Sequence, residues 1–546
     1  MTTASWDKPG PGTWLLDSSH SRPAPGPIQR DLYEQSLDRG MSEGFANFGT
    51  PLKTMQMRWV NGRFYRRLVP LVGGGRDLPA PPTPVLWLAA RLHPAFRRNE
   101  RMAKRSFETK IWRAELDRWE DEWKPALVER NLAVSDMDIT ALDDGALASH
   151  LRELHTDLLD STALHFRLHV SDMGPLGNLM VHLEDWGLHR DDTFRALISA
   201  SPATREPAKQ LRAIADALRD AGIDPTSITA LDEVRAVPGA EARLDEYLRF
   251  HGWRLTTGYD VEDRALIELP DVIVSSIRGA VDTVDRSDVA LASIAELRAR
   301  VPAEHHAVFD ELVEDARLSY GLRDENGPIT YEWPAGLLRR ALLECGRRLR
   351  ASGALVAADD VFDLTVDEIA AGLEGRGSVG RDEIAARAAE RARWRMLEPP
   401  AQLGPDEVPP PVAALPPNLA RITRVVLMVV ASMEADTTAA ALSGTGIGTE
   451  SYVGTARVVH DAIEALATME PGDVVIAPYT APTYNTVLAM AGAIVTEEGG
   501  LLCHAAVIAR ELGLPAIVGA TDAMRLIPDG ATVEVDPAAG VVRVLT

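Results

Sequence analysis

The stretch EEGGLLCHAAVIARELGLPAIVG (Glu497–Gly519) places two glycines, a histidine, an apolar helical run and a short β-like run in succession. Gly499 and Gly500 allow a tight backbone turn and the close approach of a ligand. His504 falls at the start of the predicted helix, where backbone N–H groups and the helix dipole favour an anion such as phosphate. Because a neutral imidazole is a nucleophile near pH 7, this arrangement suits a histidine that accepts a phosphoryl group. A capped core helix with an incidental histidine is the alternative interpretation of the same spacing.

The rest of the C-terminal region has the pattern of a small α/β domain. Short β-branched runs recur between Gly, Pro and Asp residues, and their sequences are SYVGTARVV, DVVIAP, AIVTEE, PAIVG, TVEVD and VVRVL. Helical pieces are expected between them, around residues 481–491 and 505–512. This alternation of strands and helices predicts an α/β fold.

The longer N-terminal part is predicted to be mainly α-helical. Apolar residues at three- and four-residue spacing dominate from about residue 95 to 395. Residues 1–85 are rich in Pro, Gly and aromatic residues, for which we expect loops, short helices and extended segments. Residues 397–418 hold eight prolines, which predict a semi-rigid extended linker. The sequence therefore predicts a large helical domain over 1–396, this linker, and a small α/β domain with a lead-in helix over 419–546.

Composition and charge limit the class of protein. Of the 546 residues, 46% are hydrophobic and 25% are charged, as in ordinary soluble globular proteins. The formal net charge of −23 disfavours nucleic acid and anionic membranes as partners. The basic stretch RLHPAFRRNERMAKR (Arg91–Arg105) is either a solvated helix face or a docking surface for an acidic partner. Two distant cysteines form no disulfide framework, and without a signal-peptide or membrane-spanning pattern we expect a cytoplasmic protein.

The segment VTEEGGLLCHAAVIARELGLPAIVG resembles the phosphohistidine motif of the phosphoenolpyruvate synthase and pyruvate phosphate dikinase family. The matching positions are Thr496, Gly499, Gly500, His504, Ala505, Ala506, Ala509, Arg510, Glu511, Gly513, Pro515 and Gly519. Upstream, GDVVIAPYTAPTY resembles the family's GDILV-x-x-x-T-x-P segment. The resemblance runs from Ser443 to the C-terminus and implies a swivelling domain in which His504 is phosphorylated. The usual Thr-Ser pair before the histidine is Leu502-Cys503 here, a pair familiar in members that phosphorylate organic hydroxyls rather than pyruvate.

Residues around His504 complete the predicted phosphohistidine site. Gly499 and Gly500 are candidates for binding phosphate through their backbone. Cys503 is either a weak hydrogen-bond neighbour of the histidine or a small buried filler. Arg510 either helps to bind phosphate or makes a structural pair with a carboxylate.

Segments of the helical part resemble substrate-binding regions of the same family. LDEYLRFHGWRLTTGYDVEDRALIELP (Leu244–Pro270) resembles part of the substrate-binding domain of rifampicin phosphotransferase and related enzymes. GTWLLDSSHSRPAPGPIQRDLYEQSLDRGMSEGFANFGTPL, which starts at Gly12, resembles the opening of the large subunit of phenylphosphate synthase and of alkylphenol-phosphorylating relatives. These resemblances imply a substrate-binding domain over 1–396 and a phenolic acceptor. A phenol, with a pKa near ~10, is also deprotonated more easily than an alkyl alcohol.

The candidate acceptor-site residues are His20, His165, His169, His251, Trp253 and Arg254. His251 and Arg254 lie in HGWR, which matches the family's Y-G-H-R region except that the histidine precedes the glycine. His165 and His169 lie four residues apart on one predicted helix face, which suits a site, a metal pair or satisfied core histidines. Because the HExxH glutamate is missing, we predict no metal there.

The family resemblance implies an ATP-grasp domain that no segment of these 546 residues matches, and the sequence has no GxxxxGK[ST] loop. We therefore expect a split enzyme, in which a separate ATP-grasp subunit holds ATP and Mg²⁺ and transfers the β-phosphoryl group to His504. His504 then passes it to the hydroxyl of a phenol or alkylphenol, so the chain is predicted to be a phosphotransferase active with that partner. The alternatives are phosphorylation of an antibiotic-like alcohol, and a non-catalytic phosphohistidine carrier or small-molecule-binding protein.

Overall fold

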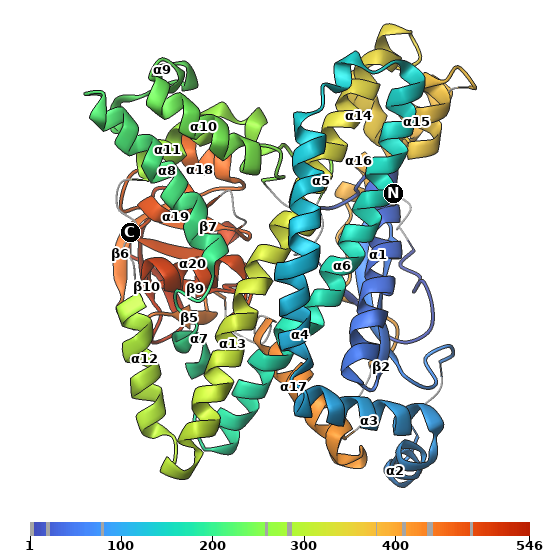
Figure 1. The fold of residues 1–546 in the computed structure, drawn as a ribbon, viewed down its shortest axis with the longest axis vertical. Helices are drawn as coiled ribbons and strands as arrows, with labels where there is room; N and C mark the ends of the chain where they lie inside the picture. Colours follow the sequence, from blue (N-terminus) through green and yellow to red (C-terminus); the bar gives the residue numbers. More distant parts are fainter. Residues whose placement is uncertain are drawn as a thin grey trace. The chain divides into compact units, whose positions relative to one another are not determined.

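The computed structural model of the chain describes residues 5–17, 22–77, 81–256, 260–280, 287–377, 379–406, 411–433, 441–480 and 484–545 (Figure 1). A large helical part precedes a C-terminal mixed sheet with helices, which confirms the predicted fold class. In the part of the chain that the structure describes, no helix is both long and apolar enough to cross a membrane.

The chain divides into two compact units, each assembled from three separate segments. Unit 1 comprises Met1–Gly174, Trp253–Asp263 and Asn326–Arg424. Unit 2 comprises Pro175–Gly252, Arg264–Glu325 and Val425–Thr546. The sequence-based domain ranges 1–396, 397–418 and 419–546 stay a prediction.

The first long helix of unit 1, α1 (Pro27–Phe48), lies where the sequence predicts only loops and short pieces. Proline occupies its first turn, and Gly49 ends it in the left-handed conformation at φ 69°. Both residue types were expected to break structure, but here they begin and end a helix of 22 residues. Within the helix, Gly40 packs against α6 (Asp144–Asp185): a Cβ there would lie 2.1 Å from the carbonyl oxygen of Ala163. The expectation of an irregular N-terminal part is therefore wrong for this stretch.

Unit 1 also contains a four-stranded sheet with the order β2-β3-β1-β4. Its antiparallel strands are β1 (Trp14–Leu16), β2 (Leu52–Val60), β3 (Arg63–Pro70) and β4 (Gln402–Leu403). Strand β4 belongs to the proline-rich segment, and the Tyr65 hydroxyl donates to the Pro400 carbonyl beside it at 2.9 Å. Strand pairing fastens this part of the segment to unit 1, and Val412–Ala414 further along it forms a 3-10 turn.

Helices make up the rest of unit 1. They are α2 (Thr83–Leu92), α3 (Pro94–Glu108), α4 (Ile111–Arg118), α5 (Lys124–Asp136), α14 (Trp333–Ala351), α15 (Val366–Leu373) and α16 (Arg381–Arg395). A π-helical turn, Pro328–Glu332, follows α13 (His306–Gly327) and leads directly into α14. The predicted lead-in helix is α17 (Pro417–Met433), which continues from unit 1 into unit 2.

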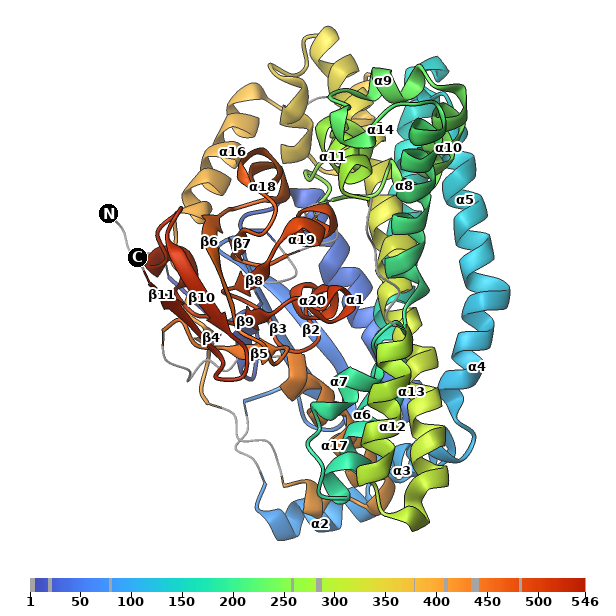
Figure 2. The ribbon, with the colours of Figure 1, turned by 90° about the vertical axis from the view of Figure 1, so that its left-hand side faces the viewer.

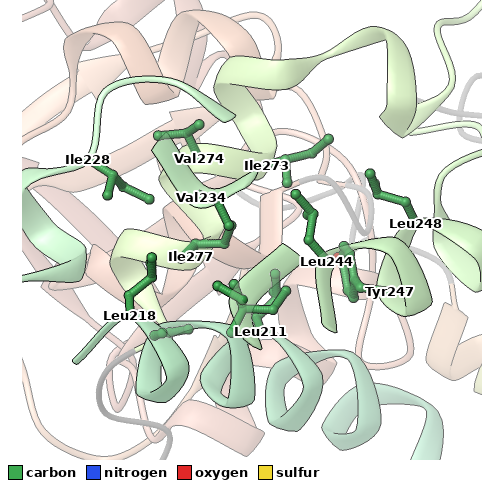
Figure 3. Close-up of a cluster of buried hydrophobic side chains, with 14 residues drawn as sticks. Leu211, Leu218, Ile228, Val234, Leu244, Tyr247, Leu248, Ile273, Val274 and Ile277 are labelled. Carbon is green, nitrogen blue, oxygen red and sulfur yellow. The ribbon is translucent and has the colours of Figure 1, made fainter. Parts of the chain in front are cut away.

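Unit 2 has a helical subdomain with its own apolar core. Its helices are α7 (Asp192–Ala196), α8 (Pro202–Asp220), α9 (Leu231–Arg235), α10 (Pro238–His251), α11 (Pro270–Gly279) and α12 (Ser287–Arg300). Figure 3 shows side chains of α8, α9, α10 and α11 pointing toward one another. Leu218, Ile228, Val234, Leu244 and Ile277 have no exposed surface there. These buried side chains form the core that packs the four helices together.

The second part of unit 2 is a seven-stranded sheet with the order β11-β10-β6-β7-β8-β9-β5. The strands are β5 (Thr445–Ile447), β6 (Tyr452–Val458), β7 (Val474–Ala477), β8 (Ala493–Thr496), β9 (Ala516–Val518), β10 (Thr532–Asp536) and β11 (Val541–Val544). Strands β6 to β9 are parallel, and the other pairings are antiparallel. The helices are α18 (Ala462–Thr468), α19 (Asn485–Met490), α20 (His504–Leu512) and α21 (Ala523–Leu526). Figure 2 shows α18, α19 and α20 beside the sheet, and α11 of the helical subdomain contacts α18 and α19.

Candidate functional site: a histidine at the carboxyl edge of the parallel strands

The candidate site of unit 2 lies where β7 and β8 end. Glu497 and Glu498 continue the pairing past β8, because their N–H groups donate to the carbonyls of Ala477 and Pro478 at 3.1 and 2.9 Å. The chain then turns through the glycines and enters α20 at His504. Ligands of open α/β sheets bind at the carboxyl ends of parallel strands, so the fold itself places His504 at a usual binding edge.

Both ring nitrogens of His504 have a polar neighbour. Nδ1 lies 2.8 Å from the hydroxyl oxygen of Thr480, and Nε2 lies 2.9 Å from the amide oxygen of Asn485. Burial lowers the pKa of His504 from its ordinary 6.5 to about 3, so the ring is neutral at pH 7. A neutral imidazole keeps one nitrogen lone pair, and its two partners hold the ring plane in place. The side chain is thus a positioned nucleophile at a helix N-terminus.

The turn before the helix requires glycine at position 499. Gly499 has φ +108°, and a Cβ there would lie 2.7 Å from Sγ of Cys503. Gly500 closes the turn, because its carbonyl accepts from the Cys503 N–H at 3.1 Å. Burial raises the pKa of Cys503, so its thiol is neutral and fills the space beside Gly499. The binding of phosphate by the two glycines stays a prediction.

Arg510 faces the loop that precedes His504. Its Nη1 donates to the Leu501 carbonyl at 2.7 Å, and its guanidinium carbon lies 4.6 Å from the ring centroid of Phe194 in α7. The next residue, Glu511, accepts the Ser199 N–H at 2.7 Å. Arg510 therefore ties the glycine loop to the helical subdomain of unit 2, while its predicted contact with phosphate stays a prediction.

Sequence reasoning missed Thr480, Asn485 and Phe194. Thr480 was within reach, since it is the threonine of the segment GDVVIAPYTAPTY that resembles the family's T-x-P pattern. Asn485 begins α19, and Phe194 in α7 lies 310 positions before His504. No local sequence pattern therefore links either residue to the histidine.

Two predicted acceptor-site residues, His165 and His169, lie together in unit 1. Their Nε2 atoms are 3.0 Å apart, and Nδ1 of His169 lies 3.0 Å from Oδ2 of Asp172. Nδ1 of His165 lies 3.2 Å from the hydroxyl of Thr330 in the π-helical turn. The two Nε2 atoms thus face each other at hydrogen-bonding distance, which is the geometry of a hydrogen-bonded chain.

The residues of HGWR are distributed over both units. His251 belongs to unit 2, where its Nε2 lies 2.8 Å from Oε1 of Gln210 and its ring packs on Tyr247. Trp253 and Arg254 belong to unit 1, where the Arg254 guanidinium stacks over the ring of Trp333. Their predicted role in an acceptor site stays a prediction. His20 lies outside the described residues.

Comparison with known proteins matches two segments of the chain to families. The family described as PEP-utilising enzyme, mobile domain, matches residues 469–540, which include His504. The family described as rifampicin phosphotransferase fourth domain matches residues 167–324.

Individual relatives also include rifampicin phosphotransferases and phosphoenolpyruvate synthases. A rifampicin phosphotransferase of Streptomyces sp is 27% identical over 463 residues, 78% of this chain and 51% of its own length. Phosphoenolpyruvate synthase of Escherichia coli is 45% identical over 97 residues, 18% of this chain and 12% of its own. Chondramide synthase cmdD of Chondromyces crocatus is 25% identical over 97% of this chain and 14% of its own length. The chain thus spans about half or less of these relatives, and the resemblance to PEP-utilising and rifampicin-phosphorylating enzymes is confirmed at the level of the family.

Proposed function

We propose that this chain is the phosphohistidine-carrying and substrate-binding part of a phosphotransferase that phosphorylates a small organic hydroxyl. The observation that carries the proposal is the setting of His504. A neutral imidazole, held by Thr480 and Asn485, stands at the N-terminus of α20 on the carboxyl edge of parallel strands. The mobile-domain match over residues 469–540 supports the same role.

In the first half-reaction, His504 receives a phosphoryl group and becomes phosphohistidine. The lone-pair nitrogen attacks phosphorus, and the backbone N–H groups at the start of α20 stabilise the added negative charge. The Asn485 amide oxygen can only accept, so Nε2 carries the proton, and the Thr480 hydroxyl donates to Nδ1, which has the lone pair.

We propose that ATP and Mg²⁺ bind to a separate ATP-grasp subunit rather than to this chain. The matched family regions, 167–324 and 469–540, bear on the histidine domain and the helical part, and the sequence has no phosphate-binding GxxxxGK[ST] loop. The partner then delivers the β-phosphoryl group of ATP, with water taken up and AMP and phosphate released.

In the second half-reaction, the acceptor oxygen attacks the phosphohistidine. The N–P bond breaks, its electron pair returns to the imidazole, and an O–P bond forms. We propose a phenol or alkylphenol as acceptor, because the N-terminal segment from Gly12 resembles that of phenol-phosphorylating relatives. The rifampicin phosphotransferase similarity over 78% of the chain supports an antibiotic-like alcohol as the second candidate.

If the phosphohistidine domain swivels, the contacts between α20 and the helical subdomain of unit 2 must break. The ties from Arg510 to Phe194 and from Glu511 to Ser199 hold it to the helical subdomain of unit 2. We propose that these ties break during the catalytic cycle and re-form when the domain returns.

Intact-mass measurement tests the proposal. The chain is incubated with ATP, Mg²⁺ and a candidate ATP-grasp protein, and then with phenol or rifampicin. One added phosphate that His504→Ala abolishes and that phenol removes supports the first candidate, and removal by rifampicin supports the second. Discharge only onto another protein indicates a carrier, and the absence of any adduct with every partner tried refutes phosphoryl transfer.

A further inference from the structure

The helices α2 and α3 of unit 1 expose apolar side chains on one helix and basic side chains on the other. They are joined at His93 and contact each other (Figure 1). On α2, the residues Val85, Leu88 and Leu92 are 55%, 52% and 64% exposed. Their spacing of three and four positions places them on one face of the helix. Grouped apolar side chains in contact with water are typical of a surface that binds another molecule.

The exposed face of α3 is basic. The residues opposite its buried side are all exposed, and they are Arg97, Arg98, Arg101, Lys104 and Arg105. Among the residues that the structure describes, no carboxylate forms an ion pair with Arg97, Arg101 or Arg105. These three are spaced by four positions, so they follow one another along the helix. We call them the arginine stripe.

The acidic residue inside this basic stretch does not neutralise the stripe. Glu100 is the one carboxylate between Arg91 and Arg105 in the sequence. Its two oxygens accept the backbone N–H groups of Asn418 and Leu419, at 3.2 and 2.8 Å, at the start of α17. The stripe therefore keeps its positive charge, although the chain as a whole has a formal net charge of −23.

The fold holds both helices in place, so this surface is formed before any partner binds. The buried side-chain amide of Asn99 in α3 donates to the Thr50 carbonyl at 2.7 Å. The backbone of Gly49 packs so closely on α3 that a Cβ there would lie 2.5 Å from the Asn99 carbonyl oxygen. In α2, Nη1 of Arg91 donates to the Ala414 carbonyl at 3.0 Å. A preformed surface loses little conformational entropy when it binds a partner.

We propose that the apolar face of α2 and the arginine stripe of α3 together form a docking surface for the nucleotide-binding subunit. This inference rests on the proposed function, which requires such a subunit. The matching surface of that subunit has an apolar groove for Val85, Leu88 and Leu92, and carboxylates opposite the stripe. Burial of the apolar side chains supplies affinity, while the paired charges select the partner and speed its association.

Charge favours this occupant over two others. In a twofold-symmetric dimer, the same surface of each copy meets its counterpart, so the two positive stripes would repel each other. An anionic lipid surface attracts the stripe but repels a chain with a net charge of −23. A partner protein can confine its carboxylates to the area that faces the stripe, so it fits both the local and the overall charge.

The experiment measures how tightly the candidate ATP-grasp protein binds the full chain. ATP-dependent phosphorylation of His504 is followed by intact mass while the concentration of the ATP-grasp protein is raised. The half-saturating concentration reports docking, whereas the maximal rate reports the transfer step. Thermal unfolding shows that each variant is folded.

The variants are Arg101→Glu, which reverses the charge at the centre of the stripe, and Leu88→Ser, which removes the central apolar side chain of α2. We expect each to raise the half-saturating concentration by about tenfold or more, with the maximal rate unchanged. Added salt should weaken docking of wild type more than docking of Arg101→Glu. The matched controls are Arg350→Glu and Val356→Ser, which make similar changes at exposed positions elsewhere in unit 1. Both should leave the half-saturating concentration unchanged.

The outcomes separate the inference from the function on which it rests. If ATP phosphorylates wild type with none of the ATP-grasp proteins tried, the proposed split enzyme fails, and the inference fails with it. If wild type is phosphorylated and both variants half-saturate at the wild-type concentration, the inference alone is overturned.

Two further measurements identify another occupant, and either positive result overturns the inference. Sedimentation with vesicles of phosphatidylcholine and phosphatidylserine that Arg101→Glu abolishes assigns the surface to an anionic membrane. A dimer of wild type, measured by light scattering, that Leu88→Ser dissociates assigns it to a second copy of this chain.

Discussion

Thr480 Oγ1 lies 2.8 Å from Nδ1 of His504, although 24 positions separate the two residues in the sequence. The contact exists because β7 and β8 are adjacent parallel strands and both residues follow their carboxyl ends. It restrains the plane of the imidazole ring.

Thr480→Val tests the value of this contact. The substitution keeps the shape of the side chain but removes the hydroxyl, so Nδ1 of His504 loses its partner. We expect phosphorylation of His504 to slow by about 10- to 100-fold, with little change in the free energy of unfolding. Thr480→Ser keeps the hydroxyl and retains most of the rate. Intact-mass time courses measure both, and equal rates for Val and Ser would contradict the assignment.

Arg510→Met tests the tie between the glycine loop and the helical subdomain. The variant removes the Arg510 donor from the Leu501 carbonyl and the cation from the ring of Phe194. We expect the free energy of unfolding to fall by about 1–3 kcal/mol and phosphorylation to slow. Arg525→Met is the matched control, because Arg525 is exposed and pairs with Asp522 at the surface of the same domain. Urea unfolding measures both, and an equal loss in the control would refute the role of Arg510.

Gly499→Ala tests the turn before the histidine. The new Cβ meets Sγ of Cys503 in a backbone conformation that favours glycine, so both a clash and backbone strain oppose it. We expect a loss of about 2–4 kcal/mol and a displaced His504 that phosphorylates poorly. Gly530→Ala has a similar φ of +80° but open space around it, and it should lose only about 1 kcal/mol. Thermal unfolding compares the two, and equal losses would show that the clash is unimportant.

The pKa of His504 predicts how stability depends on pH. Burial lowers this pKa from 6.5 to about 3. Between these two pH values the histidine is therefore protonated in the unfolded chain and neutral in the folded chain. The contribution of His504 to the free energy of unfolding is complete above about pH 6.5 and is lost as the pH falls toward 3. At pH 5 wild type should have lost about 2 kcal/mol more than His504→Gln, relative to pH 7.5. Urea unfolding at both pH values checks this, and parallel losses in the two proteins would contradict it.

Sequence patterns were most informative where the chemistry is local. The glycine pair, His504 and the helix that follows lie within one short stretch, so spacing alone placed the histidine at a helix start, as α20 shows. The strands beyond Ser443 were likewise predictable, because β-branched runs alternated with turn residues. In α1 the same reasoning failed, since proline and glycine at the ends of a helix have the same local appearance as in a loop.

The sequence by itself determined the local setting of His504, because a glycine turn and a helix start are encoded within a few residues. Only the tertiary structure decided which groups hold that side chain, since Thr480 and Asn485 meet it through strand pairing and helix packing. It also decided that Asp172 and Thr330 join the pair His165 and His169, and that His251 and Arg254 belong to different units. These relationships depend on contacts between distant segments, and no local spacing of residues specifies them.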